Sequence, residues 1–398
     1  MTQQPLNGDR IKFLKLAKGI IIGGPTGIGK TDLAVLLAHQ LKGELISCDS
    51  VQVYRGLTIG ANKTPTDPIP QHLIDVLDWQ EGTSYTAADF WEQCWTQVRE
   101  VVERGAVPIL VGGTGFYLDW IVRGRPGAPP TDPSVLLAVE EDLKNDTCWE
   151  DAVARLRAVD PEYANCMMPN DYYRLKRALV VHRMTGRPLS SFKERHHSNG
   201  MGLQMDWRCF YLTNDDRIAL LHHIDRRCEE MVRRGLIQEV QQLRKQGFST
   251  NHQAGRAIGY HETLSFLSKL EKVVDDVDRD RLLVEYIQDF QSQTRQYTRR
   301  QEKWFHAMPM FRWIKRASLA EDLSALLVEQ VVALYQMDRN RFDDTEGEIL
   351  VRECMDFRAA RSTVETAKPR QKKLRTFHSL LRLYATATDR QFLLESIQ

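Results

Sequence analysis

The sequence predicts an α/β fold in which a parallel-sheet core carries a helical insertion and a helical C-terminal region. Apolar strand patterns alternate with helical patterns early in the chain, and these strands are apolar throughout, as buried parallel strands are. A Gly- and Pro-rich stretch, GRPGAPPTDPS at 124–134, separates this core from a charged helical stretch. The pattern then returns to an apolar strand at 206–213 and is mostly helical from Asp215 onward.

The core strands and helices follow one another in a regular order. Ile20–Ile22 is expected to be the first strand, followed by a helix that ends near Gly43, and ELISCDS provides a second strand. A helix is expected between Ser84 and Gly105, and VPILV provides a third strand. The helix carries one apolar stripe at helical spacing, made of Phe90, Cys94, Val98, Val101 and Val102.

These patterns predict a division of the chain into domains. We expect a core domain formed by 15–125 and 205–335, interrupted by a helical insertion domain at 126–204. Residues 340–398 form a C-terminal extension whose role the sequence does not define. Within it, KPRQKKLR at 368–375 is basic and contains no acidic residue.

The composition restricts the class of protein. The 398 residues carry a net charge of +1, so a nucleic-acid partner would have to be held by local basic patches. The 7 cysteines include no C-x-x-C pair, which is typical of a reducing compartment and argues against a disulfide framework. No apolar run reaches the roughly 18 residues that span a membrane, and the polar N-terminus lacks a signal-peptide core. We expect a cytoplasmic monomer.

A phosphate-binding loop lies between the first strand and the first helix. It matches the pattern G-x-x-x-x-G-K-[ST] and consists of Gly24, Pro25, Thr26, Gly27, Ile28, Gly29, Lys30 and Thr31. The backbone N–H groups of such a loop cradle a di- or triphosphate at a helix N-terminus. Lys30 reaches the outer phosphate oxygens, and the Thr31 hydroxyl can hold Mg²⁺. The core is therefore P-loop NTPase-like, but the motif does not identify the group that is transferred.

Two further residues are expected to point at the bound phosphates. A standard NTPase places an Asp at the end of a second apolar strand, whereas VPILV is followed by Gly112, Gly113 and Thr114. The strand-end carboxylate near the loop is Asp49. Because the carboxyl ends of parallel strands face the ligand crevice, Asp49 and Thr114 should both face the loop. Asp49 suits a general base, or alternatively a cap or a ligand of Mg²⁺-bound water. Thr114 is otherwise a turn hydroxyl.

Several stretches, taken together and in order, resemble the tRNA dimethylallyltransferase (tRNA isopentenyltransferase) family. They run from about residue 20 to 306 and read GPTGIGKT, ELISCDSVQVYRGLTIGANK, HLIDV, YTAADF, VGGTGFYL, VDPEYANCMMPNDYYRLKRALVVHRMTGRPLS, GRAIGYHE and TRQYTRRQEKWF. The number and order of these matches make the resemblance specific.

The resemblance implies a reaction and assigns roles to residues. Members transfer a dimethylallyl group from dimethylallyl diphosphate to N6 of the adenosine 3′-adjacent to the anticodon of tRNA, and diphosphate is released. Asp49 matches the general base, and Thr114 matches a hydroxyl at the same site. Arg227 matches an arginine directed at the diphosphate, although by itself it resembles a solvated helix-face charge. His223 stands where the family usually has another arginine. Mg²⁺ would assist the leaving group.

The tRNA anticodon stem-loop would be held by basic, aromatic and amide residues in four segments. Its target base must be flipped out of the stack to react. Arg295, Arg299 and Lys303 form one basic stripe on the last helix, next to Tyr297 and Trp304. A packed aromatic face with a solvated basic face is the alternative interpretation. The expected contacts are Asp49, Ser50, Val51, Gln52; Tyr173, Arg174, Leu175, Lys176, Arg177; Arg256, Ala257, Ile258, Gly259, Tyr260, His261; and Arg299, Arg300, Gln301, Lys303, Trp304.

Three other functions fit part of the pattern. A small-molecule P-loop kinase explains the ATP-type loop and Asp49, but it does not explain the insertion or TRQYTRRQEKWF. An adenylate isopentenyltransferase would share the core and act on a free nucleotide. A nucleotide-dependent RNA-binding switch would bind RNA and form no prenylated product.

Overall fold

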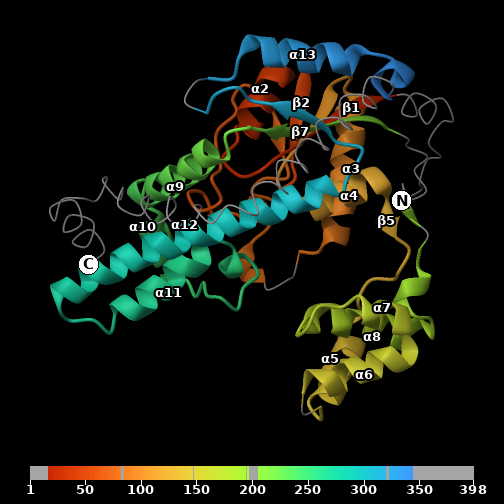
Figure 1. Cartoon of the computed structure of the whole chain (residues 1–398), viewed down its shortest axis with the longest axis vertical. Helices are drawn as coiled ribbons and strands as arrows, with labels where there is room; N and C mark the ends of the chain where they lie inside the picture. Colours follow the sequence, from red (N-terminus) through yellow and green to blue (C-terminus); the bar gives the residue numbers. More distant parts are fainter. Residues whose placement is uncertain are drawn as a thin grey trace, which may run out of the picture. The chain divides into compact units, whose positions relative to one another are not determined.

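A computed structural model describes residues 17–81, 85–146, 148–193, 195–196, 205–319 and 322–343 (Figure 1). The chain divides into two compact units, the first comprising the residues before 87 together with 93–118 and those from 204 onward. The second unit comprises 87–92 and 119–203. The expected helix start at Ser84, and the C-terminal extension beyond residue 343, lie outside the described residues.

The first unit is built on a parallel sheet of 6 strands in the order β3-β2-β4-β1-β7-β8. The strands are β1 (Lys18–Gly23), β2 (Gly43–Ser47), β3 (Gln71–His72), β4 (Val107–Val111), β7 (Asp206–Thr213) and β8 (Arg312–Lys315). The α/β fold class with a phosphate-loop core is confirmed, and the strand predicted at 206–213 returns to the sheet beside β1. The short edge strands β3 and β8 were not predicted, because neither has an apolar run long enough to stand out in the sequence.

Helices cover both faces of this sheet, as continuously apolar parallel strands require. On one face, α2 (Lys30–Leu41) and α13 (Ala325–Gln336) pack over a core of buried residues that includes Ile20, Leu45 and Phe210. Figure 1 shows α2 and α13 together on this side. On the other face lies the part of α3 (Ala87–Glu103) that belongs to this unit, where Trp95 meets Trp207 edge-on at 6.1 Å.

The C-terminal region contributes four packed helices: α9 (Arg217–Arg233), α10 (Leu236–Lys245), α11 (Tyr260–Leu270) and α12 (Asp276–His306), with the short turn η3 (Ala254–Arg256) before α11. Figure 1 shows α12 as the long helix along which α9 and α11 lie. The far end of α12 reaches the sheet, where Phe305 packs on Tyr211 with ring centroids 4.7 Å apart. This helix therefore links the helical region to the strands.

The second unit is helical and has its own small core. It contains α5 (Pro133–Leu143), α6 (Trp149–Val159), α7 (Pro161–Asn165), α8 (Tyr172–Thr185) and η2 (Leu189–Ser191). The antiparallel pair β5 (Arg125–Pro126) and β6 (Arg195–His196) closes it. Its core consists of Ala152, Val153, Leu156, Ala164, Leu175 and Ala178. Helix α4 (Gly115–Arg123) begins in the first unit and ends in the second.

No helix among the described residues is both long enough and apolar enough to cross a membrane. Short 3₁₀ turns, such as η1 (Trp79–Glu81), complete the fold.

Two neighbouring leucines of α2 test the packing of the core. Leu37 is fully buried against the sheet, whereas Leu36 is 39% exposed. Leu37→Ala should lower the free energy of unfolding by about 2–5 kcal/mol, because it removes buried methyl groups and leaves a cavity. Urea unfolding followed by fluorescence and circular dichroism measures this loss. Leu36→Ala is the matched control, and an equal loss in that variant would contradict the packing described.

Candidate active site

The phosphate loop joins β1 to α2 in a conformation that glycine makes possible. Gly27 and Gly29 have φ angles of 78° and 95°, a left-handed region that other residues adopt only at a cost. Helix α2 starts at Lys30 with no side-chain cap on Gly29. The first N–H groups of any helix lack a partner within the helix, and here no side chain of Gly29 caps them; they form the positive end of the helix dipole. This end of α2 suits an anion.

Lys30 is folded back over the loop. Its Nζ donates a hydrogen bond to the carbonyl oxygen of Pro25 at 2.8 Å. Burial, and to a smaller extent the nearby charge of Arg227, lower the pKa of Lys30 from 10.5 to about 7, while Asp49 acts in the opposite direction. A bound anion would restore the charged form of this lysine, so we expect Lys30 to favour the binding of an anion at the loop.

A second cation approaches the loop from α9. Arg227 donates from Nη1 to the Thr26 hydroxyl at 2.8 Å, and burial lowers the pKa of its guanidinium. Arg227 lies 201 residues after Thr26 in the sequence, so only the tertiary fold brings it to the phosphate loop. Arg227 is thus not a solvated surface charge, and the structure brings it to the same loop as Lys30.

His223 lies one helical turn before Arg227 and faces the same glycine. A Cβ placed on Gly27 would lie 3.4 Å from His223 and 3.8 Å from Arg227, so both side chains border the loop. Burial lowers the pKa of His223, and the charges of Arg316 and Arg227 lower it further. His223 and Arg227 therefore face the loop from the same side of α9, and His223 contributes a titratable group there.

Asp49 lies just beyond the carboxyl end of β2. Its Oδ1 accepts hydrogen bonds from the backbone N–H groups of Val51 at 2.8 Å and Gln52 at 3.3 Å. The Gln52 side chain is held in turn, because its Oε1 accepts a hydrogen bond from the Ser47 hydroxyl at 2.8 Å. Among the described residues, no donor contacts Oδ2 of Asp49. The carboxylate is thus fixed through one oxygen, and the other is left to accept a proton.

The end of β4 is tied to the phosphate loop by Gln301 of α12. Its Oε1 accepts a hydrogen bond from the Thr26 N–H at 3.0 Å, and its Nε2 donates to the Gly113 carbonyl at 2.9 Å. Gln301 was expected on the exposed tRNA surface, but its side chain is buried and both ends of its amide are engaged. Its position indicates a role in holding the loop rather than in contacting tRNA.

Tyr297, one turn before Gln301 on α12, belongs to the same cluster, although from the sequence it was expected beside the basic stripe for tRNA and not at the phosphate loop. Burial raises the pKa of its hydroxyl, as does the charge of Asp49, while hydrogen bonds with the Thr114 and Gln301 side chains act in the opposite direction. The i, i+4 spacing of Tyr297 and Gln301 was the available signal. Asp49, Thr114 and Tyr297 therefore meet at the carboxyl edge of the sheet, beside Lys30 and Arg227.

An exposed aromatic pair flanks Thr114. Phe116, on the first turn of α4, is 45% exposed and meets Trp304 edge-on, with ring centroids 6.0 Å apart. Trp304 was an expected tRNA contact, whereas Phe116 was not. Large aromatic faces open to solvent are suited to stacking on an unstacked base.

The remaining expected tRNA residues of the first unit divide by exposure. Arg299, Arg300, Lys303, Arg256 and His261 are exposed, and Ser50, Val51, Ala257 and Ile258 are partly buried. Tyr260 and Gly259 are buried, so Tyr260 has no surface to offer to a ligand. Arg295 is also not free, because it pairs with Asp225 of α9 at 2.5 Å. Only Arg299 and Lys303 of the expected basic stripe are therefore exposed.

The expected residues of the second unit lie on α8. Tyr173 is 81% exposed, whereas Leu175 is fully buried in the core of the unit, so the expectation for Leu175 was wrong. The basic side chains have partners within the unit: Arg174 pairs with Asp171, Lys176 pairs with Glu140, and Arg177 donates to Thr131.

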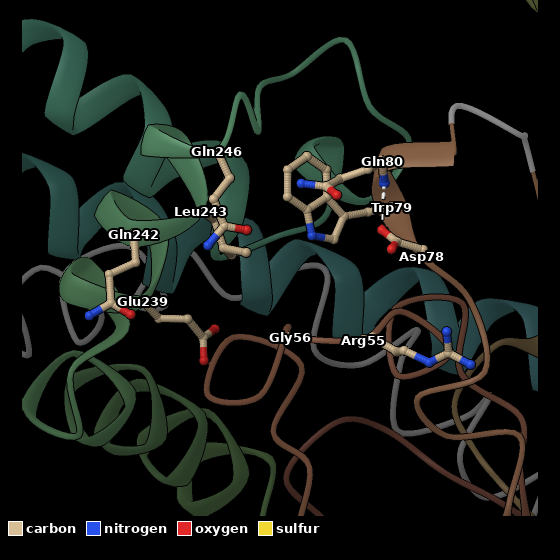
Figure 2. A pocket seen from close by; sticks show the side chains of 9 residues that line it. All are labelled: Arg55, Gly56, Asp78, Trp79, Gln80, Glu239, Gln242, Leu243 and Gln246. Atoms are coloured by element: carbon tan, nitrogen blue, oxygen red, sulfur yellow. Dashed lines mark hydrogen bonds between the residues drawn. The ribbon is translucent and has the colours of Figure 1, made fainter.

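A separate polar pocket of about 360 Å³ lies in the first unit, away from the phosphate loop (Figure 2). It lies between the segment that carries Arg55, the turn η1 and helix α10. Figure 2 shows Glu239 of α10 directed toward the loop that carries Gly56. The described residues contain no cluster of three or more His, Cys, Asp or Glu side chains that could hold a metal ion.

Comparisons with known proteins agree on one family. A sequence model of the family described as IPP transferase matches residues 52–308. The tRNA dimethylallyltransferase of Protochlamydia amoebophila is 37% identical over 303 residues, which cover 74% of this chain and 83% of that protein. The tRNA dimethylallyltransferase 9 of Arabidopsis thaliana is 34% identical over 347 residues, which cover 78% of this chain and 74% of that protein.

Solved structures give the same result. The full-length tRNA isopentenylpyrophosphate transferase of Bacillus halodurans matches with a TM-score of 0.55 and 30% identity, covering 83% of this chain and 98% of that one. A eukaryotic dimethylallyltransferase acting on tRNA matches with a TM-score of 0.64 and 28% identity, covering 80% of this chain and 78% of that one.

The pKa of Lys30 predicts that inorganic diphosphate binds with proton uptake. The free lysine, with a pKa of about 7, is mostly neutral at about pH 8, and a bound anion raises its pKa and adds close to one proton. Below about pH 6 the lysine is already charged, so its uptake disappears. Calorimetry in buffers of different ionisation enthalpy measures the uptake. Lys30→Arg keeps the charge at every pH, and undiminished uptake in that variant would contradict the assignment.

Proposed function

The chain belongs to the IPP transferase family, and from this premise we propose that it transfers a dimethylallyl group from dimethylallyl diphosphate to tRNA. The acceptor is N6 of the adenosine 3′-adjacent to the anticodon, and diphosphate is released. One observation carries the proposal: Asp49, with one oxygen fixed and the other without a donor among the described residues, stands beside a phosphate cradle that holds two cations.

The cradle binds the diphosphate of the donor and stabilises it as the leaving group. The N–H groups at the start of α2, together with Lys30 and Arg227, surround the place where negative charge grows as the allylic C–O bond breaks. Fixed cations in a partly buried site require little rearrangement when the charge develops. The diphosphate therefore departs into a site that is already built for it.

Asp49 acts as the general base. As the N6 nitrogen forms its bond to the allylic carbon, a proton passes from that nitrogen to Oδ2 of Asp49, and the C–O electron pair leaves with the diphosphate. The backbone N–H bonds to Oδ1 keep the carboxylate in place during the transfer. The Thr114 and Tyr297 hydroxyls lie in the same cluster, where either would reach the adenine by giving up their mutual contact.

Mg²⁺ fits this site through the substrate rather than through a protein cage. Mg²⁺ is commonly held by one or two protein oxygens together with phosphate oxygens and water. Thr31, at the start of α2, supplies one such hydroxyl, and the described residues contain no cluster of acidic ligands that would bind the ion by itself. When bound, Mg²⁺ would neutralise charge on the diphosphate.

The tRNA reaches the site over exposed basic and aromatic residues. Arg299, Arg300 and Lys303 lie on α12 beside Trp304, which contacts Phe116 next to Thr114. Phosphate contacts would position the anticodon loop, and stacking on the aromatic pair would hold its unstacked bases. Tyr173 on the second unit offers another exposed ring.

We propose that the protein works as a monomer in the cytoplasm.

The other candidate functions fit less well. A kinase function leaves the exposed aromatic pair without a role, and an RNA-binding switch would use that pair but gives Asp49 no proton to accept. An adenylate isopentenyltransferase needs no basic face on α12, and the relatives found are named for transfer to tRNA. A direct comparison of AMP with tRNA as the acceptor would separate this alternative from the proposal.

The proposal is tested by a transfer assay with radiolabelled dimethylallyl diphosphate, Mg²⁺ and an unmodified tRNA whose anticodon is followed by adenosines. Asp49→Asn should reduce the single-turnover rate by about 10²–10⁴-fold, because it removes the base and keeps the size of the side chain. Filter binding of tRNA to the same variant should be unchanged. No label transfer by the wild-type protein, accompanied by ATP hydrolysis or phosphorylation of a small molecule, would instead indicate a kinase.

The tRNA surface on α12 is tested by the salt dependence of binding. Arg299→Gln should reduce the slope of log K against log salt by about 0.7–0.9, the effect of losing one phosphate contact. Arg281→Gln is the matched control, because Arg281 is an exposed arginine of the same helix that pairs with Glu285. Equal slopes for the two variants would place the tRNA elsewhere.

A further inference from the structure

Four successive backbone N–H groups, from Thr58 to Ala61, are held by two side chains of the helical region. The Glu239 carboxylate of α10 accepts hydrogen bonds from Thr58 at 3.1 Å, Ile59 at 2.7 Å and Gly60 at 3.1 Å. The Tyr260 hydroxyl of α11 accepts the fourth, from Ala61 at 3.2 Å. Loops rarely offer so many aligned donors, and a carboxylate that accepts them is a strong anchor.

The two anchoring side chains are themselves joined. Tyr260 donates its hydroxyl proton to Glu239 at 2.7 Å, and its ring is fully buried. A Cβ on Gly60 would clash with the ring of Tyr260, so only glycine allows the loop to approach this closely. Burial raises the pKa of Tyr260, as does the neighbouring Glu239 carboxylate, which keeps the hydroxyl protonated as a donor.

The anchored loop is linked to Asp49 through Gln52. The Ala61 carbonyl accepts a hydrogen bond from Nε2 of Gln52 at 3.2 Å, and the backbone N–H of Gln52 is one of the two that hold Oδ1 of Asp49. Gln52 therefore connects the anchored loop on one side with the base on the other. The contact between Gln52 and Ala61 lies within the usual range of about 2.7–3.2 Å, and the contact between Gln52 and Asp49, at 3.3 Å, is slightly longer.

We propose that Glu239 and Tyr260 are positioning residues for the base Asp49. The inference rests on the proposed function and extends it to helices that contribute no reacting group. A base must be held within a fraction of an ångström of its productive position, and Asp49 lies on a segment outside regular secondary structure. The anchor supplies the rigidity that this segment lacks, and it makes the placement of Asp49 depend on α10 and α11.

The test uses the full chain and two readouts. In Glu239→Gln, hydrogen exchange measured by mass spectrometry should show faster exchange of the backbone amides at 58–60, because an amide side chain cannot accept all of their bonds. Single-turnover transfer to tRNA should fall by about 10–100-fold. The Kd of dimethylallyl diphosphate should stay within about twofold, since the phosphate loop is untouched.

Tyr260→Phe provides a milder second variant, which keeps the ring and removes only the hydroxyl. It should speed hydrogen exchange of the Ala61 backbone amide. It should also lower the transfer rate, as Glu239→Gln does. Glu271→Gln is the matched control, because Glu271 is an exposed glutamate at the end of α11 that pairs with Arg244 of α10 and does not contact the loop. This control should leave the exchange at 58–61 and the transfer rate unchanged.

The possible outcomes separate the two proposals. Faster exchange at 58–60 with an unchanged transfer rate would overturn the positioning role and leave the proposed function intact. Unchanged exchange in Glu239→Gln, or equal losses in Glu271→Gln, would also overturn the positioning role. A wild-type protein that transfers no dimethylallyl group would overturn the proposed function, and the positioning role with it.

Discussion

The amide of Gln301 joins the parts of the molecule on which the site depends. One side-chain amide accepts from the phosphate loop through Thr26 and donates to the end of β4 through Gly113. Both strand ends are thereby fixed to α12, which also packs against α9 and α11. Because an amide has one acceptor and one donor end, it can hold the two loops only in a single orientation. The positions of the candidate site residues on both loops depend on this pairing.

The side chains around the phosphate loop include two cations, Lys30 and Arg227, and one carboxylate, Asp49. Lys30 and Arg227 both lie against the phosphate loop, and burial and their mutual repulsion lower the pKa of Lys30 to about 7. Asp49 opposes this repulsion only in part. A bound anion would offset this repulsion, so in the proposed reaction the same repulsion would favour binding of the diphosphate and stabilise it as the leaving group. His223, placed on the same face, lets this balance vary with pH.

Much of this site was predictable because its signals are local. The phosphate loop is a contiguous motif, and parallel strands force their following residues to one edge, so the meeting of Asp49 and Thr114 with the loop followed from order alone. The surface residues were harder to predict. Leu175, Tyr260 and Gln301 lie in segments that look exposed by composition, yet each is buried, because the packing of neighbouring helices decides which side of a helix faces solvent. Arg295 was misjudged for the same reason, since its partner Asp225 is on another helix.

The sequence by itself determined the alternation of strands and helices, the phosphate loop and the strand-end position of Asp49, since each depends on residues within one or two elements. Only the tertiary structure decided which distant groups meet that loop. Arg227, Tyr297 and Gln301 arrive from α9 and α12, and Glu239 and Tyr260 hold the segment that follows Asp49 from α10 and α11. Such meetings depend on how helices pack around a shared core. That packing is set by the combined burial of many side chains and not by any local pattern.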